Sequence, residues 1–134
     1  MKKLFIAAIA SLTFIACNDG KKQEKALLDD VIKLHDKVMG NDYHLMRNKM
    51  KIDTLLLTAP APQKTELTQL SANLIVTETA MENWMQKFDP EQKGKSHDEI
   101  VAYLNSQKKQ IAIIDSQMNL AINKSSQYIS QLKK

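Results

Sequence analysis

Apolar and polar residues follow one another along this 134-residue chain in a pattern that marks out three long segments. Within each segment the apolar residues recur at intervals of three and four, which places them on one side of a helix. Proline-containing breaks at residues 58–62 and 89–95 separate the segments, because proline lacks an amide donor and disfavours helix in the residue before it. The pattern predicts helices over about residues 23–57, 63–88 and 97–132.

The apolar repeat averages about 3.5 residues in each segment, which is typical of helices that pack as a left-handed supercoil. Helices joined by short connections run antiparallel to each other. We therefore expect an all-α domain over residues 25–134, folded as an antiparallel up-down-up three-helix bundle with coiled-coil-like packing. Ser96 and Glu99 fit a capping box that would begin the third helix.

Gly40 leaves the number of helices open. Glycine inside a helix costs about 1 kcal/mol relative to alanine, so a break at this point would give four helices. We favour one long, kinked helix, because the apolar spacing continues through Gly40 without a shift.

Several polar residues occupy positions that would face the core. We interpret them as setting the register and orientation of the helices, as buried asparagine does in coiled coils. The alternative is a small polar pocket. These residues are Asn41, Asn48, Thr77 and Gln107.

The N-terminal residues have the pattern of an exported lipoprotein. Two lysines precede an apolar run that is too short to span a bilayer as a helix. The run leads into Phe14-Ile15-Ala16-Cys17, which resembles a bacterial lipobox. This resemblance implies that residues 1–16 are a lipoprotein signal peptide that is removed, and that Cys17 carries a diacylglyceryl or acyl lipid. Residues 17–24 would then form the lipidated cysteine and a short tether.

Such an anchor predicts a place in the bacterial cell envelope, on the inner or outer membrane, facing the periplasm or the cell surface. Two or more acyl chains hold a protein stably on a membrane. Loss of the signal and its two lysines would lower the formal charge from +4 to +2. Because acidic and basic residues are well mixed in the remainder, nucleic acid is not an expected partner.

The chain shows no motif of an enzyme active site. A phosphate-binding loop, a zinc-protease helix and a nucleophile elbow are all missing from the sequence. His35 and Asp36 come nearest to an acid–base pair, but adjacent residues on a helix point about 100° apart, so we expect them not to meet. We therefore predict a protein that is not an enzyme and has no cofactor beyond the lipid on Cys17.

A histidine and several methionines form a second stripe beside the core positions of the first segment. Imidazole and thioether groups suit copper, particularly Cu(I). We interpret the stripe as core packing, because each helix of a bundle needs a wide apolar face and methionine fills irregular cores well. The alternative is a copper-binding or small-ligand-binding lipoprotein. The stripe consists of His35, Met39, Met46 and Met50, to which Met81, Met85 and His44 could add.

Two short motifs are similar to those of a group of small Bacteroidota lipoproteins. They are the stretch from Leu34 to Met39 and the stretch from Ala80 to Phe88. Members of this group are sometimes labelled viral A-type inclusion protein, a label that reflects coiled-coil similarity. The resemblance implies a lipoprotein with a helical bundle and implies no activity.

We therefore expect a non-enzymatic interaction or structural module that is held to a membrane by its lipid. Its outer faces would bind a partner protein or a second copy of the chain. Trp84, Met85 and Phe88 are the candidate partner-binding residues, because large apolar side chains that stay exposed mark binding patches.

Overall fold

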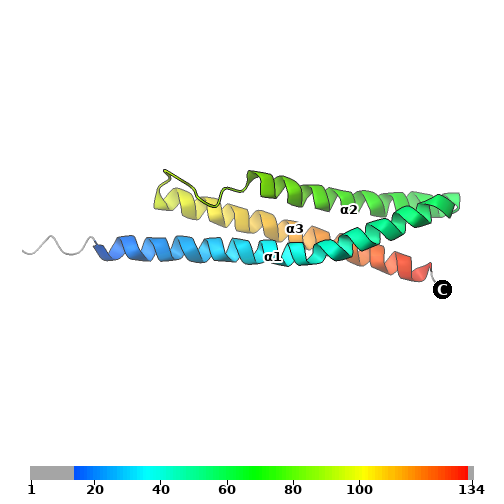
Figure 1. Ribbon diagram of the computed structural model, residues 1–134, viewed down its shortest axis with the longest axis horizontal. Helices are drawn as coiled ribbons and strands as arrows, with labels where there is room; N and C mark the ends of the chain where they lie inside the picture. The colour runs from blue at the N-terminus through cyan, green and yellow to red at the C-terminus, as the bar shows by residue number, and fades with distance from the viewer. Residues whose placement is uncertain (1–13, 133–134) are drawn as a thin grey trace, which may run out of the picture.

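A computed structural model describes residues 14–132, with side chains described from residue 19 onward. Over this range the chain forms the helices α1 (Phe14–Thr58), α2 (Ala61–Lys87) and α3 (His97–Gln131), with no strand. Figure 1 shows α2 returning antiparallel to α1, and α3 running back in the direction of α1. The predicted all-α, up-down-up three-helix bundle is confirmed.

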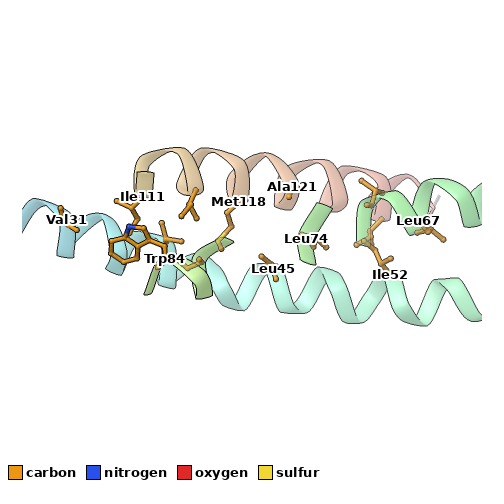
Figure 2. Packing of buried hydrophobic residues seen from close by; sticks show 14 residues of the cluster. Val31, Leu45, Ile52, Leu67, Leu74, Trp84, Ile111, Met118 and Ala121 are labelled. Atoms are coloured by element: carbon orange, nitrogen blue, oxygen red, sulfur yellow. The ribbon is translucent and has the colours of Figure 1, made fainter. Parts of the chain in front are cut away.

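The core follows the apolar pattern of the sequence. In α1 the fully buried residues are Val31, Val38, Leu45 and Ile52. They are seven residues apart, about two helical turns, so they lie on the same face of the helix. Figure 2 shows Leu45 and Ile52 among apolar side chains of the other two helices, including Leu67 and Leu74 of α2 and Met118 of α3. The buried apolar residues of α2 and α3 are Leu67, Leu70, Leu74, Met81, Trp84, Leu104, Ile111, Ile114, Met118, Ala121 and Ile129.

Helix α1 is one continuous element, so the four-helix alternative is wrong. It passes through Gly40, where an added Cβ would meet nothing within 4 Å. The residue therefore lies on an open side of the helix, and no close approach requires glycine there. Figure 1 shows α1 changing direction in its C-terminal half, as expected for one long bent helix.

The start of α1 differs from the prediction. The helix begins at Phe14 rather than near residue 23, so the residues expected to form a tether are helical. A contact with the start of α3 accounts for part of this difference. Glu24 Oε1 lies 2.7 Å from His97 Nδ1, and a Cβ added to Gly20 would approach the same imidazole to 3.2 Å. Packing against the start of α3 thus supports helix where the sequence offers no apolar repeat.

The other helix ends follow local rules. Helix α2 begins just before Pro62, whose missing amide is not needed in a first turn. Helix α3 begins with the predicted capping box: the Ser96 amide donates to Glu99 Oε2 at 2.8 Å, and Ser96 Oγ accepts from the Glu99 amide. The hydrogen bond from the Ser96 backbone lowers the pKa of the Glu99 carboxyl below its usual range.

Polar pairs join α1 to α3 at one constant offset. Lys108 Nζ donates to Asp30 Oδ2 at 2.5 Å, and Lys37 Nζ donates to Asp115 Oδ2 at 2.6 Å. Further along, Asn41 Nδ2 donates to Asn119 Oδ1 at 3.3 Å. In each pair the two residues are 78 positions apart, so the pairs specify the same register for the two parallel helices.

Asn48 continues this register at a buried position. Its Nδ2 donates to Ser125 Oγ at 2.9 Å, to Ser126 Oγ at 2.7 Å and to the Ile122 carbonyl at 3.1 Å. Asn41 and Asn48 therefore both bond across the α1–α3 interface, as residues that set register do. The other two polar core positions differ, because Thr77 Oγ1 donates to the Leu74 carbonyl of its own helix and Gln107 is half-buried.

Candidate functional site

The candidate lipidation residue, Cys17, belongs to the start of α1. Its side chain falls outside the part of the chain whose side chains are described, as do residues 1–13 of the predicted signal. Within residues 14–132, none of the helices is both long enough and apolar enough to cross a bilayer.

The three candidate partner-binding residues do not share one exposed patch. Trp84 is only 6% exposed and stacks on Phe88, with ring centroids 4.7 Å apart. Phe88 is half-buried and faces the Tyr103 ring at 6.3 Å. Met85 alone of the three is exposed. Trp84 therefore belongs to the core, and Phe88 packs against it.

His35 packs against this aromatic cluster. Its ring centroid lies 6.1 Å from that of Trp84, and its Nδ1 lies 3.0 Å from Asp36 Oδ1. The expectation that His35 and Asp36 do not meet is therefore wrong: both side chains are long enough to bend toward each other along the helix surface. Trp84 Nε1 is buried and has no hydrogen-bond partner among the described residues. The neighbouring imidazole is tilted 32° to the indole and makes no hydrogen bond with that donor.

The residues of the predicted His/Met stripe do not form one site, because they lie in different parts of the structure. His35 joins the aromatic cluster, and His44 is exposed with its ring 5.5 Å from that of Tyr43. Met50 is exposed and borders a different hollow of about 520 Å³, between the C-terminal parts of α1 and α3. Only Met39 and Met46 remain together.

Met39 and Met46 line a hollow on the surface of the bundle with three methionines from the other helices. We call this site, of about 310 Å³, the methionine hollow. Helix α2 contributes Met81 and Met85, and α3 contributes Met118. The remaining lining residues are Val38, Asp42, Glu78 and Glu82.

The interpretation of the stripe as core packing is wrong for its methionines. Met39, Met46 and Met85 are 39%, 37% and 38% exposed, whereas Met81 and Met118 are almost fully buried. The reason is the narrow inner face of α1. Val38 and Leu45 fill that face, and each methionine follows one of them by a single residue, about 100° around the helix.

The sequence provided only part of this site. Met39 and Met46 were candidates from their spacing, and Met81 and Met85 were named as possible additions, whereas Met118 of α3 was not among the candidates. Its apolar position in the third segment gave no sign that it would meet the other four. That meeting depends on how α3 packs beneath the seam between α1 and α2.

In the described part of the chain, no three or more His, Cys, Asp or Glu side chains gather as they would around a metal ion. Comparison with protein-family models, curated proteins and solved structures gives no match. The function must therefore be argued from the residues of this chain.

Proposed function

We propose that this protein is a lipid-anchored helical-bundle lipoprotein of the bacterial cell envelope, with a non-enzymatic interaction or structural role. The observation that carries the proposal is the lipobox-like stretch Phe14–Cys17, preceded by a short charged and apolar leader. The anchor would be a diacylglyceryl thioether on Cys17, with an acylated N-terminus after cleavage before that residue. Each buried CH₂ of these chains adds about 0.8 kcal/mol of membrane affinity.

The use of cysteine supports this role. Cys17 is the one cysteine among 134 residues, and a lone cysteine in an exported protein needs an explanation. Lipidation gives one, since it converts the thiol to an unreactive thioether. The bundle itself is held by aliphatic packing and polar register pairs, so it needs no disulfide in an oxidising compartment.

The surface of the bundle supports an interaction role more than catalysis. Val76 and Leu120 are more than half exposed and lie together beside a hollow of about 280 Å³ between α2 and α3. Exposed apolar side chains that border a hollow are typical of contact surfaces for proteins. The occupant in this role would be a partner protein or a second copy of the chain.

Metabolic labelling tests the anchor. The full chain, expressed in a bacterium supplied with an alkyne fatty acid, should take up the label and remain in the membrane fraction. Cys17→Ser should abolish the label and release the protein from the membrane, because no other thiol is available.

A matched control separates lipidation from general thiol acylation. Ser106 is exposed on α3, so Cys17→Ser combined with Ser106→Cys restores one thiol at a distant position. This variant should stay unlabelled. Label on Cys17→Ser, or recovery of label with Ser106→Cys, would contradict a specific anchor at Cys17.

A further inference from the structure

We propose that the methionine hollow binds one soft monovalent metal ion, Cu(I), through thioether sulfurs supplied by all three helices. This goes beyond the anchoring role, since it assigns a ligand to the folded domain itself. It also replaces the His/Met stripe of the sequence with a different set of residues. The proposed ligands come from Met39, Met46, Met81, Met85 and Met118.

Most methionines of the chain converge on this hollow. The chain has seven methionines, and five of them line this one hollow. Met81 and Met85 are four residues apart on α2, and Met39 and Met46 are seven apart on α1, so each pair shares a helix face. Methionine that only filled gaps in the core would be distributed along the bundle, whereas here it gathers on one short stretch of it.

The methionine hollow is accessible from solvent. Met39, Met46 and Met85 are each more than a third exposed, and Met81 and Met118 are buried beneath them. An ion can therefore reach the exposed thioethers without opening of the bundle. The buried methionines can supply further sulfurs from below, where water is excluded and a weakly hydrated ion is favoured.

Acidic side chains give the methionine hollow a negative charge. Asp42, Glu78 and Glu82 line the hollow, and Lys49 Nζ lies 3.7 Å from Glu78 Oε2. Three carboxylates and one ammonium leave the site net negative, which raises the local concentration of cations. The carboxylates need not bind the ion directly to have this effect.

The chemistry of the ligands selects the ion. Thioethers are soft ligands that prefer Cu(I), whereas Mg²⁺ and Ca²⁺ need oxygen ligands and Zn²⁺ is bound by thiolate, imidazole or carboxylate. His35 lies in the aromatic cluster and is not among the residues that line the hollow. A site made of thioethers alone is expected to reject divalent ions and to accept Ag(I), a stable mimic of Cu(I).

A competition titration tests the site. The full chain carrying Cys17→Ala, which removes the only thiol, is purified in detergent and titrated with Cu(I) against a coloured chelator without oxygen. We expect one equivalent to bind. Met46→Leu combined with Met85→Leu should weaken binding at least tenfold, while circular dichroism stays unchanged because leucine and methionine have similar volumes.

Two variants serve as controls. Met50→Leu alters an exposed methionine on the same helix outside the hollow, and His35→Ala removes the imidazole of the original stripe. Both should bind Cu(I) as tightly as the Cys17→Ala parent. The proposal would be overturned if the Cys17→Ala parent did not bind Cu(I). It would also be overturned if Met50→Leu or His35→Ala lost as much Cu(I) affinity as the variant with Met46→Leu and Met85→Leu.

A second test follows Ag(I) binding by NMR and does not depend on the measured affinity. With ¹³C-labelled methionine methyl groups, one equivalent of Ag(I) should shift the resonances of at least three hollow methionines and leave that of Met50 in place. A shift of Met50 alone, or of no methyl group, would show that the hollow is not the site. Neither result would bear on the lipid at Cys17, so the two proposals fail separately.

Discussion

Among single residues, Asn48 shows most clearly how a polar side chain specifies this bundle. It is almost completely buried in α1, yet its amide reaches two serine hydroxyls and a carbonyl of α3. A buried polar group costs free energy unless it is hydrogen-bonded, so only the correct register of α1 against α3 satisfies it. A shift by one residue would bury Asn48 without these partners.

This residue gives a direct prediction for stability. Asn48→Ala should lower the free energy of unfolding by about 1–3 kcal/mol, because it leaves a void and removes the donor to Ser125 and Ser126. Urea denaturation measures the difference. Asn105→Ala is the matched control, since Asn105 is exposed and donates only to the Val101 carbonyl of its own helix. A loss no larger than that of the control would rule out the role given to Asn48.

Among the helices, some ends are determined by neighbouring residues and others by contacts with distant parts of the chain. The capping box at Ser96 and the proline near the start of α2 could be read from neighbouring residues. The start of α1 could not, because residues 18–24 are polar and their helix is supported by Glu24 and Gly20 meeting His97, far along the chain. The apolar spacing predicted which side of each helix faces the core, because the apolar residues on that side repeat within the helix itself.

Two glycines predict effects of opposite sign. Gly94, in the connection between α2 and α3, has a φ of 77°, a left-handed conformation in which a side chain costs about 1–2 kcal/mol. Gly40 is helical with open space around it, where alanine gains about 1 kcal/mol. Gly94→Ala should therefore lower the free energy of unfolding and Gly40→Ala should raise it, as measured by urea denaturation. A change of the same sign in both variants would contradict these conformations.

The α1–α3 interface also predicts a dependence on pH. The hydrogen bond and charge of Lys108 hold the pKa of the Asp30 carboxyl below its usual value of about 3.9. The folded protein then binds this proton less readily than the unfolded chain, so the contribution to stability is complete above the unfolded pKa. It is lost as the pH falls below about 4 and passes through the lower folded value.

Asp30→Asn tests this link. The difference in unfolding free energy between the wild type and this variant should be largest at neutral pH and should shrink as the pH falls below about 4. Lys108→Met should show the same trend, because it removes the other half of the pair. A difference that stays constant over that range would show that the pair does not lower the pKa of Asp30.

At the scale of the whole molecule, the described residues form an elongated bundle of three helices (Figure 1), and the proposed lipid at Cys17 would be attached near the start of α1. The sequence predicted the class of fold because periodic apolar positions report directly on helix faces. It placed Met39 and Met46 in a stripe beside the core positions, but it did not predict the placement of Met118 of α3 beside them. That placement depends on how α1 is rotated against α2 and α3, which no single segment encodes.

The most direct test of the proposed lipid anchor is the mass of the protein extracted from bacterial membranes. We expect a chain that begins at Cys17 and carries a diacylglyceryl group, with or without a further acyl chain, and we expect no unmodified chain in the membrane fraction. A chain that retains residues 1–16 with an unmodified thiol at Cys17 would rule out the proposed lipid anchor.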